Sequence, residues 1–355
     1  MADGFGVYVH IPFCAHRCDY CAFATWTDRH HLTDRYVDAL VVDVARTVEA
    51  GMPAATSVFV GGGTPSLLAG EALGRILDAI PTVGGAEVTV ECNPDTVSAS
   101  LFAAYREHGV NRISLGVQSM VPAVLRALGR THDPANVERA VTLVRAAEFE
   151  SFNLDLIYGS VGESDDDWAV TIERALALDP PHISAYGLTV EAGTPLAATP
   201  ERHPDDDDQA SKYEVVDDRL RAAGLANYEI SNWAKPGHEC RHNLLYWAQG
   251  DYAGFGCAAH AHRDGRRWWN VRTPERYIEL VEARLSPESA SETLDEPTRR
   301  FERLELALRT RDGVPADALD ADELAGMVER RGDRLVLTQS GRLMANEIAV
   351  RLRDR

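Results

Sequence analysis

The sequence predicts an α/β protein: a partial, TIM-like parallel (β/α)6 barrel followed by a smaller C-terminal α+β domain of winged-helix-like type. Three observations predict this class. Short β-branched or aromatic segments alternate six times with longer amphipathic segments across residues 6–188. Chemically unusual residues gather where the predicted strands end. The alternation stops near residue 200, where a different pattern begins.

Each predicted strand precedes a helical segment. The strands cover 6–10, 57–60, 87–91, 112–117, 153–157 and 182–188, and the helices cover 34–49, 71–80, 98–108, a helical stretch to about 147, and 165–178. This order is typical of parallel strands joined by helical crossovers. Apolar periodicity does not count barrel strands, so a doubly wound open sheet remains an alternative.

The residues at the strand ends favour the barrel. A cysteine cluster, a Gly-Gly-Gly-Thr-Pro turn at 61–65 and four polar side chains all lie at or just past a strand's carboxyl end: Glu91, Gln118, Asp155 and Tyr186. Parallel barrels build their active sites at that end. One shared rim would therefore account for all of these residues.

Beyond residue 200 the expected elements are fewer. We expect a helix from the aspartate run at 205–208 to about 223, an irregular stretch over 232–270, a helix over 297–311, and a strand at 335–338 before a helix at 340–352. The expected domains are a core over 1–200, a connecting region over 201–290 and a small C-terminal domain over 291–355.

Composition excludes several classes of protein. The 355 residues carry a formal net charge of −19 and no Lys/Arg-rich stripe, so nucleic acid is not an expected partner. No apolar run has the length of a transmembrane segment. Residues 1–4 lack the basic flank and apolar stretch of a secretory signal, and we therefore expect a cytoplasmic protein.

Three of the six cysteines lie within eight residues. Cys14, Cys18 and Cys21 follow the first predicted strand with the spacing Cys-x3-Cys-x2-Cys. Three thiolates can hold three irons of a [4Fe–4S] cluster and leave the fourth iron open. A zinc site, with His10 or His16 as the fourth ligand, is the alternative, because structural zinc takes four ligands.

This spacing resembles the signature of the radical S-adenosylmethionine (SAM) enzymes. The stretch Tyr8-Val9-His10-Ile11-Pro12-Phe13-Cys14 is further similar to the oxygen-independent coproporphyrinogen III oxidase-like, or HemN-like, family. The resemblance covers nearly the whole chain. It implies a radical SAM barrel in which SAM binds the open iron and is cleaved by one electron from the cluster.

The resemblance also implies which residues contact SAM. Glycines of the 61–65 turn would let the backbone approach SAM closely, Glu91 would hold its ribose, and Arg130 would face its carboxylate. The full expected set is Tyr8, Tyr20, Gly62, Gly63, Thr64, Glu91, Gln118, Arg130 and Asp155.

Two features separate this chain from the coproporphyrinogen oxidases. Those enzymes have a fourth cysteine where this chain has Phe23. The stretch 242–247 is His-Asn-Leu-Leu-Tyr-Trp, which resembles the H-N-x-x-Y-W motif of the HemW-type haem chaperones. It implies haem binding by His242, Asn243, Tyr246 and Trp247, with His242 as the candidate iron ligand and Cys240, His260 and His262 as competitors.

The resemblance thus implies a haem chaperone with a [4Fe–4S] cluster and SAM, haem as cargo, and acceptor haem proteins, such as respiratory enzymes, as partners. An electron donor is implied if SAM is cleaved. The enzymatic alternative is oxidative decarboxylation of coproporphyrinogen III. The second alternative is a non-catalytic, metal-binding structural protein. Whether the chain is an enzyme stays open, although coproporphyrinogen oxidase activity is not expected.

Overall fold

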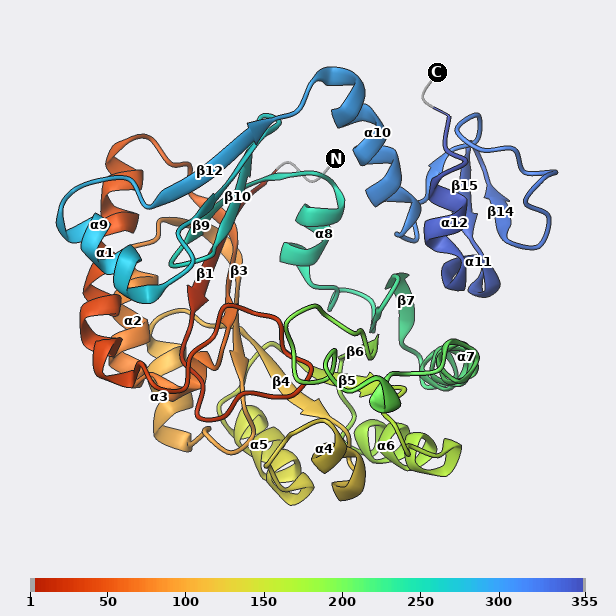
Figure 1. The fold of residues 1–355 in the computed structure, drawn as a ribbon, viewed down its shortest axis with the longest axis horizontal. Helices are drawn as coiled ribbons and strands as arrows, with labels where there is room; N and C mark the ends of the chain where they lie inside the picture. Colours follow the sequence, from red (N-terminus) through yellow and green to blue (C-terminus); the bar gives the residue numbers. More distant parts are fainter. Residues whose placement is uncertain (1–3, 354–355) are drawn as a thin grey trace.

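Six parallel strands form the centre of the molecule (Figure 1). The computed structural model describes residues 4–353, so residues 1–3 of the expected signal-free N-terminus lie outside it. The strands are β1 (Phe5–Ile11), β2 (Ala55–Gly62), β3 (Thr82–Cys92), β4 (Arg112–Gln118), β5 (Ser151–Tyr158) and β6 (His182–Gly187). They pair in chain order, each parallel to the next. This confirms the predicted parallel α/β fold.

Helices cover the outer face of this sheet. They are α1 (Thr33–Glu49), α2 (Gly70–Asp78), α3 (Ala99–Glu107), α4 (Pro122–Ala127), α5 (Pro134–Ala146) and α6 (Asp165–Ala177). Several begin at capping side chains: Ser98 accepts from Leu101 N, and Ser164 forms a capping box with Asp167. These local signals explain why the helices start close to the predicted positions.

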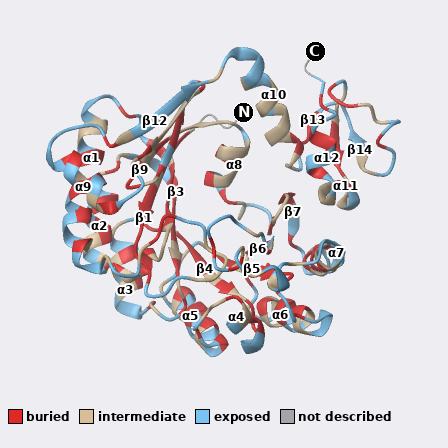
Figure 2. Ribbon diagram, in the orientation of Figure 1, coloured by how far each residue is buried: buried red, intermediate tan, exposed pale blue. Residues whose placement is uncertain are grey.

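The apolar core lies between the sheet and these helices (Figure 2). On β4, Ile113 and Leu115 are fully buried in that core, whereas the alternate residues Arg112 and Ser114 line a cavity on the other face. Successive side chains of a strand point to opposite faces. The inner face of the sheet is therefore polar, and it is this face that carries the candidate site.

The sheet continues beyond the six strands on both sides. One edge adds β9 (Asp251–Phe255), β10 (His260–Arg263), β11 (Arg266–Asn270) and β12 (Glu288–Thr293), and the other adds β8 (Asn232–Ala234) and β7 (Ala226–Glu229). β9 is parallel to β1, and the remaining added strands pair antiparallel. The sheet order runs from β12 to β7, which is the arrangement of a partial barrel.

The expectation of an irregular stretch over 232–270 was therefore wrong. That stretch contains β8 to β11 and the short helix α8 (Arg241–Trp247). Its strands are only three to five residues long and are separated by left-handed glycines such as Gly256 and Gly265. Such strands depend on pairing with a sheet edge rather than on their own periodicity, so the sequence alone shows little sign of them.

The C-terminal part has its own small core. Its elements are α10 (Glu296–Leu308), β13 (Val314–Pro315), β14 (Val328–Arg331), β15 (Arg334–Leu337), α11 (Gln339–Leu343) and α12 (Ala345–Ala349). Leu308, Leu335 and Ile348 are buried together there. The helix expected at 340–352 is in fact two short helices, because the backbone of Met344, at φ −105° and ψ 20°, interrupts it.

Two further helices connect these regions. They are α7 (Asp206–Ala222), which follows the N-cap Asp205 as the aspartate run predicts, and α9 (Pro274–Glu282), which packs against α1. Within the described range, none of the helices combines the length and the apolar character that crossing a membrane requires.

Candidate functional site

The cysteine loop lies at the carboxyl end of β1. Cys14 is buried, Cys18 and Cys21 are half-buried, and all three are free thiols. Hydrogen bonds from Cys14 N to Trp26 O (3.0 Å) and from Cys21 N to Cys18 O (3.2 Å) fold the loop back on itself. Burial raises the pKa of the Cys14 and Cys21 thiols, so a positive group nearby is needed to keep them as thiolates.

Side chains from the turn after β2 and from the segment after α4 contact these thiols. Thr64 Oγ1 lies 3.6 Å from Cys14 Sγ, and Arg130 Nη1 lies 3.7 Å from Cys18 Sγ. Among residues 4–353, no three His, Cys, Asp or Glu side chains are grouped as the ligands of a single ion. A [4Fe–4S] cluster takes each thiolate ligand on a separate iron, and Cys14, Cys18 and Cys21 supply three free thiols from one loop.

The glycine turn after β2 is built for close backbone contact. Gly62 adopts φ 108°, and its N–H donates to Glu91 Oε2 at 3.2 Å. A Cβ on Gly63 would lie 2.7 Å from Phe13 O and 3.0 Å from Cys14 Sγ. Only glycine fits at these positions, so the turn holds the cysteine loop against the sheet.

Gln118 ends β4, and Arg130, which follows α4, places its side chain against the same end of that strand. Gln118 has a left-handed backbone, with φ 63°, which is uncommon for a residue with a side chain and is often associated with a functional site. Arg130 donates from Nη2 to Gly116 O at 2.7 Å and from Nε to His132 Nδ1 at 3.3 Å. Tyr20 lies within the influence of the Arg130 charge, and burial raises the pKa of its phenol.

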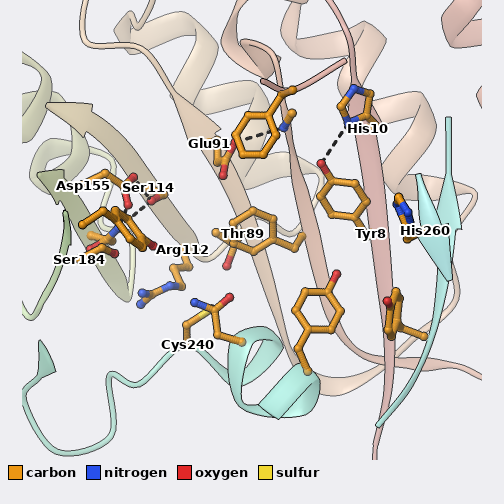
Figure 3. Close-up of a pocket in the computed structure, with 18 of the residues that line it drawn as sticks. Tyr8, His10, Thr89, Glu91, Arg112, Ser114, Asp155, Ser184, Cys240 and His260 are labelled. Atoms are coloured by element: carbon orange, nitrogen blue, oxygen red, sulfur yellow. Dashed lines mark hydrogen bonds between the residues drawn. The ribbon is translucent and has the colours of Figure 1, made fainter. Parts of the chain in front are cut away.

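Glu91, Asp155 and Tyr8 point inward from β3, β5 and β1 (Figure 3). Burial, reinforced by the nearby Asp155, raises the pKa of Glu91 to about 8. Burial also raises the pKa of Asp155, although Asp155 accepts hydrogen bonds from Ser114 Oγ (2.7 Å) and from Asn153 Nδ2 (2.8 Å). The Tyr8 hydroxyl lies 3.1 Å from His10 Nδ1. These are strongly desolvated polar groups, as in a ligand site.

These inward residues surround a cavity of about 630 Å³, which lies within the size range of cofactor sites. Of the expected SAM residues, Tyr8, Gly62, Glu91 and Asp155 line it, and of the expected haem residues, Asn243 and Tyr246 do. The other expected residues are not part of its lining; they are Tyr20, Gly63, Thr64, Gln118, Arg130, His242 and Trp247. The two groups expected from different motifs thus meet in one cavity.

Helix α8, which carries the His-Asn-Leu-Leu-Tyr-Trp stretch, lies at the amino ends of the inner strands. The carboxylate of Glu87 on β3 accepts hydrogen bonds from the backbone N–H groups of Arg241 (3.1 Å) and His242 (3.1 Å) at the start of α8. These bonds attach the helix to the sheet. Sequence reasoning missed Glu87; its alternation with Thr89 and Glu91 on one strand face was the available signal.

His242 is fully buried behind the cavity wall. Its Nδ1 lies 2.9 Å from Ser57 Oγ and its Nε2 lies 2.8 Å from Tyr246 Oη. Its ring stacks on Phe59 with the centroids 5.5 Å apart. Burial lowers the pKa of His242 to about 3, so the imidazole is neutral. His242 could coordinate a metal only after giving up one of these hydrogen bonds.

His260, one of the competitors expected from the sequence, is placed differently. It is exposed, lines the cavity and packs beside Trp269 with the ring centroids 5.8 Å apart. Its ring nitrogens have no hydrogen-bond partner within residues 4–353. His260 therefore offers the cavity an imidazole whose nitrogens are not engaged by the described residues.

Comparison with known proteins identifies the superfamily and the fold. The model of the Radical SAM superfamily matches residues 8–175, a range that begins within β1 and contains the cysteine loop and β2 to β5. The solved structure described as coproporphyrinogen III oxidase (HemN) from Escherichia coli, a radical SAM enzyme, aligns with a TM-score of 0.84 at 22% identity, covering 98% of this chain and 89% of that one. Sheet and cysteine loop together define a radical SAM protein.

Curated relatives narrow the family. The heme chaperone HemW of Mycobacterium tuberculosis (strain ATCC 25618 / H37Rv) is 43% identical over 364 aligned positions, covering 97% of this chain and 93% of that protein. The heme chaperone HemW of Escherichia coli (strain K12) is 37% identical, covering 96% of each. The chain belongs to the HemW family.

Proposed function

We propose that this chain is a haem chaperone that binds haem in the central cavity and passes it to haem-requiring proteins. The observation that carries the proposal is that Asn243 and Tyr246, from the His-Asn-Leu-Leu-Tyr-Trp helix, line the same cavity as the inner-face residues Tyr8 and Glu91. The printed names of the relatives point the same way. Phe23, where the oxidases carry a fourth cysteine, argues against coproporphyrinogen oxidation.

A [4Fe–4S] cluster and SAM are part of this proposal. Cys14, Cys18 and Cys21 would hold the cluster, which supplies one-electron chemistry when bound. The SAM residues would be Tyr8, Tyr20, Gly62, Gly63, Thr64, Glu91, Gln118, Arg130 and Asp155. The short contacts of the glycine turn and the position of Arg130 beside Cys18 support this assignment.

The decisive experiment is anaerobic reconstitution of iron and sulfide, followed by haem titration with and without SAM. We expect a saturable shift of the haem Soret band, and transfer of the bound haem to an apo-form of a respiratory haem protein. Incubation with coproporphyrinogen III, SAM and a reductant is expected to give no vinyl product. Vinyl product would favour the oxidase, and bound zinc without sulfide would favour the structural alternative.

Replacing the two histidines separately tests which one binds the iron. His260→Ala is expected to change the haem absorption and electron-spin signatures, because it removes a cavity-lining imidazole whose nitrogens have no hydrogen-bond partner among the described residues. His242→Ala is expected to weaken haem binding strongly and to lower the free energy of unfolding by ~2–4 kcal/mol, since Ser57 and Tyr246 lose their partner and a void remains.

The control for both is His31→Ala, which removes an exposed imidazole outside the cavity lining. If His242→Ala instead abolished the iron-ligand signature and His260→Ala left it intact, His242 would be the ligand and its ring would have to rotate on haem binding.

Glu91 predicts a pH dependence of stability. In the unfolded chain its carboxyl loses its proton near pH 4.5, whereas in the folded chain it keeps the proton to about pH 8. The folded state therefore binds more protons in this window, and the free energy of unfolding falls as pH rises through it. Glu91→Gln should remove this part of the decrease in unfolding free energy with pH, which is at most ~1.4 kcal/mol per unit of pKa shift.

Urea unfolding at pH 5, 6, 7 and 8 measures this effect. The matched control is Glu107→Gln, which changes an exposed carboxyl on α3 and should leave the pH profile as in the wild type. Parallel profiles for the wild type and Glu91→Gln would mean that Glu91 is ionised in the cavity.

We further propose that the chain works in the cytoplasm. All six of its cysteines are free, as is usual where thiols are kept reduced. Acceptor haem proteins, such as those of a respiratory chain, would be its partners, together with an electron donor if SAM is cleaved.

A further inference from the structure

Arg112, the first residue of β4, is a buried cation that the site described above does not use. Its side chain is 3% exposed and projects into the cavity on the side of α8 (Figure 3). Nη1 donates to Ser151 Oγ (3.1 Å) and to His238 O (3.2 Å), whereas Nε has no hydrogen-bond partner. Within residues 4–353 the guanidinium makes no ion pair.

A second unsatisfied group lies beside it. Thr89 is the β3 residue paired with Arg112 in the sheet; it is fully buried, lines the cavity, and its Oγ1 has no partner. Two neighbouring strands thus present unpaired hydrogen-bonding groups to the same part of the cavity wall.

The carboxyl groups nearby are already engaged. Asp155 accepts from Ser114 and Asn153, and Glu87 accepts from the backbone at the start of α8. His182 is also occupied: its Nδ1 lies 2.7 Å from Asn153 Oδ1 and its Nε2 lies 2.8 Å from Tyr228 Oη.

An unpaired buried guanidinium is costly, because water no longer solvates the charge and no anion replaces it. An unsatisfied buried hydroxyl adds to that cost. Groups retained in this state are expected to meet an anion when a ligand binds. The planar guanidinium fork matches a carboxylate in particular.

Arg112 is attached differently from Arg130, the arginine assigned to the SAM carboxylate. Arg130 bonds Gly116 O and also contacts Cys18. Gly116 lies four residues further along β4 than Arg112. Four strand residues span about 13 Å at ~3.3 Å per residue. The backbone of Arg112 thus lies well apart, along β4, from the carbonyl that Arg130 bonds.

We propose that Arg112 and Thr89 form a carboxylate-binding subsite in the cavity, and that it takes a propionate of the tetrapyrrole cargo. The subsite rests on the proposed haem function, because Asn243 and Tyr246 of the 242–247 stretch line the same cavity. Cys240, just before that stretch, lies near Arg112 (Figure 3). It assigns the orientation of the cargo: the propionate edge would lie toward β3 and β4, and the iron toward His242 and His260.

The test compares haem with haem dimethyl ester, which lacks the carboxylates, on the anaerobically reconstituted full-length protein. We expect the wild type to prefer haem. Arg112→Gln should weaken haem binding about 10- to 100-fold, the range for a charge-assisted hydrogen bond, and leave binding of the ester unchanged. Thr89→Val, an isosteric change, should reduce the same preference by a smaller factor without loss of stability.

The matched control is Arg174→Gln, which removes an arginine of the outer helical layer and should keep the wild-type preference. Equal loss of haem and ester in Arg112→Gln, with Thr89→Val unaffected, would make Arg112 a structural residue and overturn the subsite. A weakened affinity for SAM with an unchanged preference for haem would assign the carboxylate to SAM and overturn the tetrapyrrole. If the wild type bound neither haem nor its ester, the proposed function itself would fail.

Discussion

Cys18→Ser is expected to abolish the iron–sulfur cluster, with iron and acid-labile sulfide falling from about four each per chain to near zero. The thiol of Cys18 is half-buried and contacts Arg130, so no neighbouring thiol can replace it without moving the loop. Much of the haem binding should remain, because α8 contacts the amino ends of the strands and the cysteine loop lies at their carboxyl ends. Iron and sulfide analysis and haem titration measure the two sites separately.

The matched control is Cys92→Ala, which removes a buried thiol on the outer face of β3 and should keep the cluster. Loss of haem binding in step with the cluster in Cys18→Ser would show that the two ends of the cavity are coupled.

Gly63→Ala is expected to remove the cluster while every cysteine is still present. The added Cβ would lie 2.7 Å from Phe13 O, 2.8 Å from Ile11 O and 3.0 Å from Cys14 Sγ, and two of these atoms belong to backbone that cannot rotate away. The cysteine loop must therefore shift. Overpacking of this kind costs ~1–3 kcal/mol of stability, and the displaced Cys14 should lower the iron content severely.

Gly84→Ala serves as the control, because a Cβ at Gly84 meets nothing within 4 Å and its backbone needs no left-handed conformation. Its iron content and urea midpoint should match the wild type. A Gly63→Ala protein with full iron content would mean that the turn does not hold the loop.

The local features of the fold were predictable from the sequence. Strands such as 112–117 carry their own apolar alternation, and helices such as 165–178 begin at capping side chains, so each can be recognised within one short window. The cysteine spacing and the glycine turn are equally local, and the family comparison confirms the radical SAM class they indicated.

What could not be predicted depends on contacts between distant segments. The burial of His242 depends on Ser57 and Phe59, about 180 residues earlier in the chain. The attachment of α8 depends on Glu87, and strands β9 to β12 exist because β1 offers an edge for pairing. None of these partners lies in the local sequence around His242 or within residues 251–293.

Along the inner strands, neighbouring residues face opposite sides of the sheet, so one packs in the core and the next lines the cavity. On β4, Ile113 belongs to the packed shell and Arg112 to the hollow interior; on β3, Val88 and Thr89 are divided in the same way. Substitutions at core positions such as Ile113 and Val88 therefore change the stability of the fold. Substitutions at cavity positions such as Arg112 and Thr89 change ligand binding. Such a protein can acquire a new ligand through substitutions at every other residue of its strands, while the hydrophobic core that stabilises the fold is unchanged.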